Sequence, residues 1–292
     1  MIDAMREDYP LGELCEALGV SASGYHAARS RPPGPRAREN RELLGAMCAI
    51  HAHRHTRCYG SPRMTRQLRR SGLRCSENRV ARLMAREGLR ARPRRPFWPK
   101  TTRPDHAAHP SPNLLADAAP PAAPGTHLAS DITYIPTREG WLYLAVVIDL
   151  YSRAILGWDL SESLRAEGVA SALRRALAGG LVRTDAIFHS DRGCQYSAAS
   201  TRRLLAAHGL RQSMSAAGCC YDNAAAESFF ASLKSETLED GQPPPSKARA
   251  RLLLFDYLET FYNRKRLHGA LGYLTPAEAI KAHFPNNSNQ LN

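Results

Sequence analysis

The stretch HSDRGCQYS, residues 189–197, follows a short apolar run at 186–188 that is typical of the end of a buried strand. Asp191 stands where this run stops and a turn containing a glycine begins. A carboxylate at the end of a strand is held by a rigid sheet, which suits it to metal chemistry. The stretch therefore predicts that Asp191 lies in a catalytic site at the end of a strand, together with further residues from elsewhere in the chain.

Two further acidic residues lie where they can reach the same edge. Asp131, in SDITYI, lies inside an apolar, strand-like run, and Glu227, in YDNAAAESFFASLKSE, lies on a predicted helix with 35 residues between it and Asp191. Three carboxylates on two strands and a helix can converge to hold divalent metal ions. Each acid alone also has a structural explanation, as a turn residue or as an acid in the first turn of a helix. Their joint occurrence favours catalysis.

Four motifs in this order resemble the transposases of the IS3 group of insertion sequences: DITYIPTREGWLYLAVVIDLYSR, FHSDRGCQYS, CCYDNAAAESFFASLKSE and YNRKRLHGALGYLTPAEA. The resemblance covers roughly residues 38 to 284. In that family, as in retroviral integrases, an Asp, an Asp and a Glu form a DDE triad on an RNase H-like fold. The resemblance implies that Asp131, Asp191 and Glu227 are the catalytic residues and the metal ligands.

The expected cofactor is Mg²⁺ or Mn²⁺, as two ions bound by the three carboxylates. We expect Asp131 to bridge both ions, Asp191 to complete one and Glu227 the other. Two ions about 3.5–4 Å apart can activate a water or a DNA 3′-hydroxyl and stabilise the departing 3′-oxygen, so no covalent protein intermediate is required.

Several other residues of the motifs have predicted roles. Lys234 lies seven residues after Glu227 and thus on the same helix face, and it resembles a basic residue of the family that contacts DNA near the cleaved bond. His189 and Asn223 match motif positions with auxiliary roles. Asp149, at the end of the second strand, has no place in the triad, and we predict that it is structural.

The charge of the chain is concentrated in its first hundred residues. The net charge is +13, and residues 1–100 contain 21 Lys and Arg against 9 Asp and Glu, whereas the remainder is almost balanced. This distribution predicts a polyanionic partner. Because no stretch reaches the roughly 18–20 apolar residues of a membrane span, and the N-terminus lacks the pattern of a signal peptide, we expect no membrane association and a location in the bacterial cytoplasm, at the nucleoid.

Residues 38–95 are predicted to form a helix-turn-helix DNA-binding domain. A first helix covers about 38–53, a second begins with Ser61 as N-cap and Pro62 at the first helical position, and a third is capped by Ser76 and closed by Gly88. The third helix would direct toward DNA the polar side chains Asn78, Arg79, Arg82 and Arg86.

The remaining segments complete the predicted organisation. Residues 1–30 form a partial helix-turn-helix, 96–126 a flexible linker rich in Pro and Ala, 241–284 a helical basic extension and 285–292 a disordered tail. The extension carries the basic cluster Arg264, Lys265 and Arg266, which we predict to bind DNA. The resemblance leaves open whether Met1 begins a complete transposase or the second frame of a frameshifted pair.

Residues 127–240 are predicted to form the catalytic core. Three successive strands, then helix, strand, helix, strand and helix, predict an α/β fold with a mixed five-stranded sheet and flanking helices, preceded by an all-α region. The name RNase H-like comes from the resemblance.

The predicted function is that of a transposase, a polynucleotidyl transferase that binds the terminal inverted repeats of its insertion sequence. It would catalyse metal-dependent strand cleavage and transfer into target DNA, that is, transposition. Expected partners are DNA, further copies of the chain and the product of an upstream frame. Two alternatives stay open: a metal-dependent nuclease without strand transfer, and a non-catalytic DNA-binding repressor.

Overall fold

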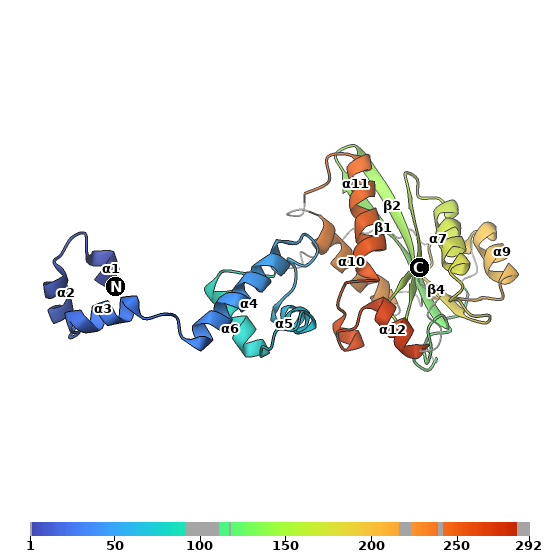
Figure 1. Cartoon of the computed structure of the whole chain (residues 1–292). Helices are drawn as coiled ribbons and strands as arrows, with labels where there is room; N and C mark the ends of the chain where they lie inside the picture. Colours follow the sequence, from blue (N-terminus) through green and yellow to red (C-terminus); the bar gives the residue numbers. More distant parts are fainter. Residues whose placement is uncertain (1, 92–110, 117, 216–222, 239–241, 285–292) are drawn as a thin grey trace. The chain divides into compact units, whose positions relative to one another are not determined.

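The computed structural model describes residues 2–91, 111–116, 118–215, 223–238 and 242–284. The chain divides into two compact units, residues 1–47 and 48–292 (Figure 1). The tail predicted at 285–292 lies outside the described residues. The described elements before the sheet are the helices α1 (Ile2–Met5), α2 (Leu11–Ala17), α3 (Ala22–Ser30), α4 (Pro35–Ala52), α5 (Ser61–Arg70) and α6 (Glu77–Arg86).

The short helices at the N-terminus follow the predicted pattern. α2 and α3 are the two helices of the partial helix-turn-helix predicted within residues 1–30, and Ser21 caps α3 by accepting a hydrogen bond from the Gly24 N–H at 3.0 Å. Gly19, with φ of 64°, forms the turn between them in the left-handed region that glycine tolerates best. The helix pair and its cap could therefore be predicted from local sequence alone.

α5 and α6 form the predicted pair of helices in the basic region, with one difference in the caps. Ser76 caps α6 as predicted, accepting from the Arg79 N–H at 3.3 Å. The predicted cap at Ser61 is wrong, because Gly60 has extended geometry and is itself the N-cap, so that Ser61 is the first helical residue. Pro62 lies in the first turn, where its missing N–H costs no hydrogen bond.

The catalytic core contains a five-stranded sheet in the order β3-β2-β1-β4-β5. The strands β1 (His127–Thr137), β2 (Gly140–Asp149) and β3 (Ile155–Ser161) form the predicted antiparallel meander. The strands β4 (Ile187–Ser190) and β5 (Arg211–Met214) run parallel to β1 and β4, respectively. The helices of this region are α7 (Ala166–Ala178), α8 (Cys194–Ser197), α9 (Ala199–Ala207) and α10 (Ala224–Thr237).

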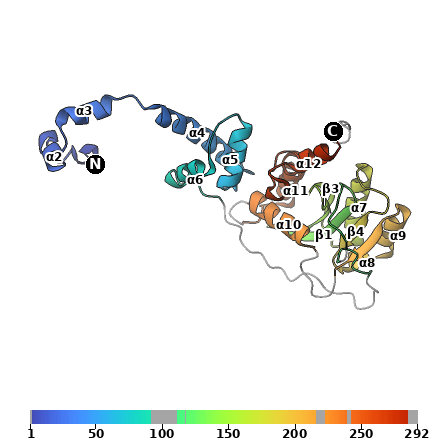
Figure 2. The same cartoon turned by 90° about the horizontal axis from the view of Figure 1, so that it is seen from below.

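Helices cover both faces of the sheet (Figures 1 and 2). Along β2, Leu144, Val146 and Ile148 pack into the core shared with α10, whereas Ala145 and Val147 pack into the core shared with α7 and α9. Alternation along a strand buried on both faces explains its continuously apolar sequence. Gly157 on β3 allows α7 to approach, since a Cβ there would lie 2.1 Å from the Ala172 carbonyl oxygen.

The C-terminal extension packs on the α10 face. It consists of α11 (Lys247–Phe255), a π-helix (Asp256–Tyr262), a short 3₁₀ helix (Gly269–Leu271) and α12 (Pro276–His283). Thr275 and Glu278 form a capping box at the start of α12, where Pro276 takes the first helical position. Within the described ranges, no helix combines the length and the apolar character needed to cross a lipid bilayer.

The division between the compact units lies at 47/48, before the predicted linker. Tyr59 is fully buried in the core of the α10 face, where its hydroxyl accepts a hydrogen bond from the Leu267 N–H at 3.2 Å. Arg70 donates two hydrogen bonds to the Glu278 carboxylate, at 3.0 and 2.8 Å. These contacts join the second half of the predicted helix-turn-helix domain to the C-terminal extension.

The predicted linker at 96–126 is described from residue 111 onward, apart from residue 117. The Pro112 carbonyl accepts a hydrogen bond from the Met214 N–H, and the Leu114 N–H donates to the Ser213 hydroxyl at 2.9 Å. Residues 111–116 therefore lie against β5. A flexible linker stays a prediction for residues 96–110, which lie outside the described residues.

Candidate active site

Parallel pairing of β1 with β4 brings two predicted carboxylates to neighbouring strands. The register pairs Ser130 with Ser190, so Asp131 and Asp191 are the next residues along the two strands. β4 ends at Ser190, and Asp191 begins the turn that follows. The register thus places these two aspartates at neighbouring positions on adjacent strands, with Asp131 inside β1 and Asp191 directly after β4.

Asp131 lies in an electrostatically unfavourable position for a carboxylate. Burial, together with the negative charges of Asp191 and Glu227, raises the pKa of Asp131 to about 8, against the lowering effects of the Ile132 N–H and Lys234. The Ile132 N–H donates to Asp131 Oδ1 at 2.8 Å. Asp191, Glu227 and Lys234 therefore all act on Asp131 at this edge of the sheet.

The turn after β4 fixes the position of Asp191. The Gly193 N–H donates to Asp191 Oδ1 at 3.0 Å, closing a local turn. Arg192 donates from Nε to the Ser215 carbonyl at 2.8 Å, which ties the same turn to the end of β5. Local sequence and the neighbouring strand together hold this carboxylate.

Glu227 and Lys234 lie on α10, which packs beside β1. Glu227 raises the pKa of Asp131 and Lys234 lowers it, as expected for two side chains on the same face of α10. Glu227 is exposed, whereas burial lowers the pKa of Lys234 to about 8, against the attraction of Asp131. The residues 216–222 that lead into this helix lie outside the described residues.

The three acids form an open arrangement. Among the residues that the structure describes, no three His, Cys, Asp or Glu side chains lie close enough together to form a metal site. The chemistry of the three carboxylates nevertheless fits a hard divalent cation. Burial is the main cause of the raised pKa of Asp131, and the negative charges of Asp191 and Glu227 add to it. A bound cation would offset that negative charge.

Tyr196 supports the site and was not predicted from the sequence. Its side chain is buried, and burial together with the charges of Asp131 and Asp191 raises its pKa well above the usual value. Ser130 donates to the Val146 carbonyl at 2.8 Å, so the Tyr196 hydroxyl donates to Ser130 Oγ at 3.2 Å. The aromatic residue five positions after Asp191 is visible in the sequence, but its contact with Ser130 is not.

The two residues with predicted auxiliary roles have different surroundings. His189 is fully buried, and its ring nitrogens lie 2.8 Å from the Ser213 hydroxyl and 3.1 Å from that of Ser215, so it braces β4 against β5. Asn223 is the N-cap residue of α10 and makes no side-chain capping hydrogen bond. Auxiliary roles in catalysis stay a prediction for both.

Asp149 is a structural residue, as predicted. Its carboxylate is fully buried and accepts hydrogen bonds from the Gly125 N–H at 2.9 Å and the Ser152 N–H at 2.8 Å, with a third from the Ser152 hydroxyl. These bonds fix the turn between β2 and β3. Both oxygens of the Asp149 carboxylate thus accept hydrogen bonds within the fold.

The predicted DNA-reading residues lie along α6. Asn78, Arg82 and Arg86 are exposed, and Arg79 is half-buried. Val80, Leu83 and Met84 are buried, as the helical spacing predicts. Arg86 pairs with Glu87 at 3.0 Å, an exposed contact that contributes little to stability. The helix therefore presents a polar, basic face to solvent.

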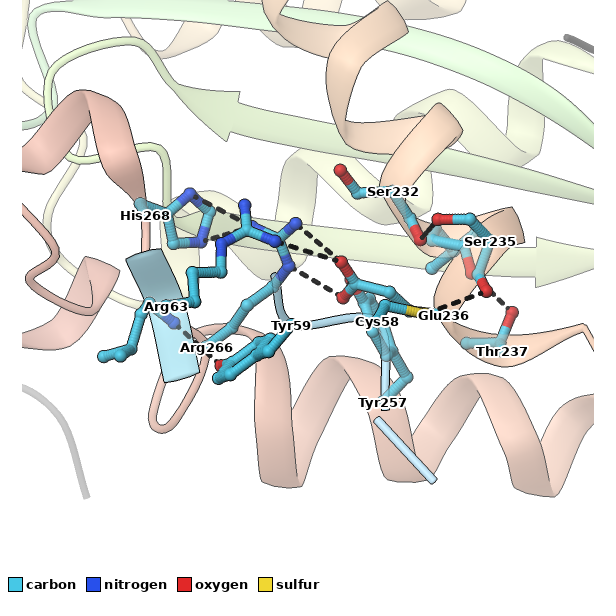
Figure 3. Close-up of polar contacts among 12 residues, drawn as sticks. Cys58, Tyr59, Arg63, Ser232, Ser235, Glu236, Thr237, Tyr257, Arg266 and His268 are labelled. Atoms are coloured by element: carbon cyan, nitrogen blue, oxygen red, sulfur yellow. Dashed lines mark hydrogen bonds and ion pairs between the residues drawn. The ribbon is translucent and has the colours of Figure 1, made fainter. Parts of the chain in front are cut away.

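The basic cluster at 264–266 divides into two kinds of residue. Arg264 and Lys265 are exposed and stay predicted DNA contacts. The prediction that Arg266 contacts DNA at the surface is corrected by the structure. Arg266 is only 2% exposed and donates to both carboxylate oxygens of Glu236, at 2.7 and 2.8 Å (Figure 3). A buried charge needs such a partner, and this pairing holds the guanidinium within the fold.

The buried pair joins three regions of the chain (Figure 3). Glu236 comes from α10, and Arg266 from the C-terminal extension. Tyr257 donates to Glu236 Oε2 at 2.7 Å, and Arg63 Nη1 from α5 lies 3.9 Å from Glu236 Oε1. The helix that carries Glu227 is thereby anchored at its C-terminal end to α5 and to the extension.

His268 predicts a pH dependence of stability. Burial lowers the pKa of His268 to about 3, with contributions from the positive charges of Arg266, Arg63 and Arg153. Below the ordinary value of about 6.5, the unfolded chain takes up a proton that the folded chain refuses, so stability falls as pH drops from 6.5 toward 3. Glutamine does not take up this proton. We therefore expect His268→Gln to reduce the loss of stability by up to about 1.4 kcal/mol for each unit by which the pH falls.

The measurement is the free energy of urea unfolding at pH 7.5, 6.5, 5.5 and 4.5. His208→Gln, at an exposed position at the end of α9, serves as the control and should follow the parent chain. Parallel curves for the parent and His268→Gln between pH 6.5 and 4.5 would contradict a buried neutral imidazole.

Comparisons with known families divide the chain in the same way. Residues 38–97 match a family described as an HTH-like domain. Two families described as integrase core domains match residues 121–220 and 208–276.

Known proteins match almost the whole chain. Transposase InsF of insertion sequence IS3A from Escherichia coli (strain K12) is 39% identical over 278 residues, covering 95% of this chain and 96% of the relative. A 31 kDa protein of insertion element IS600 from Shigella sonnei is 36% identical, covering 90% and 96%. The HTLV-2 integrase catalytic core domain, solved in complex with magnesium, aligns with 54% of this chain and 97% of that chain at 14% identity and a TM-score of 0.42.

Proposed function

Because the chain belongs to the transposases of the IS3 family, we propose that Asp131, Asp191 and Glu227 are its DDE triad and catalyse cleavage and transfer of DNA strands. The single observation that carries this assignment is the electrostatic coupling at one sheet edge. Asp191, in the turn after β4, and Glu227, on α10, both raise the pKa of Asp131 on β1. Perturbed carboxylates gathered from separate elements are typical of catalytic sites.

Divalent metal ions belong to this proposal. Asp131, Asp191 and Glu227 would hold Mg²⁺ or Mn²⁺, as two ions, because carboxylate oxygens are the ligands that these hard cations prefer. When bound, the ions supply activation of the attacking hydroxyl or water and stabilisation of the departing oxygen. The excess negative charge around Asp131 is the feature of this chain that supports cation binding.

The remaining residues of the edge would orient the substrate. Lys234 lies on the face of α10 that acts on Asp131, and its ammonium would bind a phosphate beside the cleaved bond. The Gly193 N–H keeps the Asp191 carboxylate turned in one direction. The buried Tyr196 hydroxyl would keep Ser130, the residue before Asp131, in place.

Recognition of the element's terminal inverted repeats is assigned to α6. We expect the double substitution Arg79→Ala and Arg82→Ala to weaken binding to an end duplex, by about 1–3 kcal/mol for each side chain that reads a base. The measurement is a titration by electrophoretic mobility shift with the end duplex and with a scrambled duplex. Specific binding should fall more than non-specific binding.

Arg202→Ala with Arg203→Ala is the matched control, since both residues are exposed on α9, a helix that packs with α7 on the sheet rather than with α6. It removes the same charge and should preserve discrimination between the two duplexes. Unchanged specific binding by the variant with both Arg79 and Arg82 replaced would contradict the assignment of α6 as the helix that reads the DNA bases.

A strand-transfer assay separates the transposase from its two alternatives. The chain is incubated with Mg²⁺, a labelled end duplex and a target plasmid. Nicked end duplex and labelled plasmid are both expected. Nicking without joining would favour the nuclease, and binding without either product would favour the repressor.

The setting in the cell follows from the relatives. We propose that the chain acts on bacterial DNA in the cytoplasm, at the nucleoid, because its relatives come from Escherichia coli and Shigella sonnei. Two element ends must be held together, so we expect further copies of the chain on the DNA. A product of an upstream frame is a further proposed partner.

A further inference from the structure

A cavity of about 310 Å³ opens beside the first turns of α10, on the flank away from the triad. Its polar lining consists of arginine, histidine and serine side chains: Arg63, Arg153, Arg266, His268, Ser228 and Ser232. With 3.6 residues per turn, Ser228 and Ser232 lie roughly a third of a turn around α10 from Glu227. The cavity and the triad therefore share one helix but face different directions.

The cavity carries excess positive charge. The charged groups that act on Tyr262, in its wall, are Arg266, Arg153, Arg63 and Glu236. Three arginines against one glutamate leave about two positive charges unbalanced. His268 adds no charge at neutral pH, since burial and the same three arginines lower its pKa to about 3.

Two of the arginines are held in place by the fold. Arg266 is locked by Glu236, and the Arg63 guanidinium lies 5.6 Å from the centre of the Tyr59 ring. They supply fixed positive charge in the wall. Such charge costs no reorganisation when an anion arrives.

Arg153 is the arginine available to a ligand. Within the part of the chain that the structure describes, no hydrogen bond or ion pair engages its guanidinium. Its backbone has φ of 62°, a left-handed conformation that is uncommon for residues other than glycine. Asp149 imposes this turn through Ser152, while the Arg153 N–H donates to the Asp149 carbonyl at 2.8 Å.

We propose that this cavity binds a phosphate of a DNA strand, with Arg153 as the direct contact and Arg63 and Arg266 as fixed charges behind it. Arginine suits phosphate because its planar guanidinium donates two parallel hydrogen bonds. Because the cavity lies on a different side of α10 from Glu227, this phosphate is distinct from the phosphate of the cleaved bond. The inference takes its ligand from the proposed function, namely DNA acted on beside α10.

The first test is the salt dependence of binding to a fluorescent duplex, measured by anisotropy without divalent metal. Losing one phosphate contact lowers the slope of log K against log salt by about 0.9. We expect Arg153→Gln to show this smaller slope and affinity about tenfold weaker at low salt, and Arg153→Lys to recover most of the slope. Arg153→Gly, which suits the left-handed backbone, should fold and behave like Arg153→Gln.

Arg203→Gln is the control on α9, on the opposite face of the sheet, and it should keep the parent slope. Circular dichroism and thermal unfolding confirm that each variant is folded. An unchanged slope in both Arg153→Gln and Arg153→Gly would overturn the proposal. Because the readout is binding, this failure is distinct from failure of the triad, which is read as loss of nicking.

The second test locates the phosphate. Single neutral methylphosphonates are placed at successive positions of the duplex. One position should weaken binding by the parent chain about tenfold yet leave Arg153→Gln unaffected. Inorganic phosphate is tested separately by thermal shift. Stabilisation by inorganic phosphate that depends on Arg153, without any sensitive DNA position, would make the cavity a small-anion site and overturn the DNA assignment.

Discussion

Asp131→Asn, Asp191→Asn and Glu227→Gln are each expected to reduce nicking of an end duplex by at least about a hundredfold. Loss of residues that only support metal ligands typically costs 10–100-fold, and these carboxylates are the proposed ligands themselves. Each substitution keeps the shape of the side chain and removes its charge. Folding and binding to the duplex should therefore survive while chemistry fails. The measurement is the initial rate of nicking in Mg²⁺, with circular dichroism to confirm the fold.

Asp185→Asn is the matched control for the triad. Asp185 is exposed, lies just before β4 and has a φ of 63°, which asparagine tolerates well. It should nick at the parental rate. Asp149→Asn is less suitable as a control than the sequence indicates, because Asp149 accepts three hydrogen bonds in the buried turn and its substitution should reduce stability.

Metal exchange gives an independent check of the same site. Mg²⁺ and Mn²⁺ should support nicking, and Ca²⁺ should permit binding with little reaction because its coordination shell is larger and looser. A folded Glu227→Gln protein that nicks at the parental rate in Mg²⁺ would rule out the proposed triad.

Arg266→Met is expected to destabilise the fold by about 3–5 kcal/mol, the largest stability effect that we predict. Removing one member of a buried ion pair leaves the other charge without compensation. Both side chains here are almost fully buried, at 3% and 2% exposure. Glu236 would keep only the Tyr257 hydroxyl and the more distant Arg63 as partners. The measurement is the free energy of urea unfolding at pH 7.5.

The double variant Glu236→Leu with Arg266→Met separates the value of the pair from the cost of breaking it. Apolar replacement of both members is often nearly neutral. We expect most of the stability to return, short of the part lost because the Tyr257 hydroxyl has no acceptor. Arg264→Met, two residues earlier and exposed, is the control and should change stability by less than about 0.5 kcal/mol. A loss below about 1 kcal/mol for Arg266→Met alone would show that the pair is dispensable.

Much of the fold could be predicted from local sequence because its causes are local. The continuous apolar run of β2 is typical of a strand buried on both faces, and the apolar residues of α6 recur at helical spacing on its buried side. Caps such as Ser21 and Ser76 act on N–H groups three residues away. The position of Asp191 followed from the apolar run that stops just before it, whereas Asp131 lies inside β1.

The roles of several charged and aromatic residues were decided only by the tertiary structure. Arg264 and Arg266 are two residues apart in one basic run, yet one is exposed and the other is buried on Glu236, 30 residues away. Tyr59 belongs by sequence to the helix-turn-helix region, but its ring packs in the core beside α10.

The physical reason is that burial and pairing are set by residues distant in the chain. Whether an arginine meets water or a carboxylate depends on which helix packs over it, and a periodic pattern carries no record of that partner. The family resemblance, the succession of strands and helices along the chain and the candidate triad could all be read from the sequence. Only the packing of α5, α10 and the C-terminal extension decided that Arg266 is a buried anchor and that Arg153 faces an electropositive cavity.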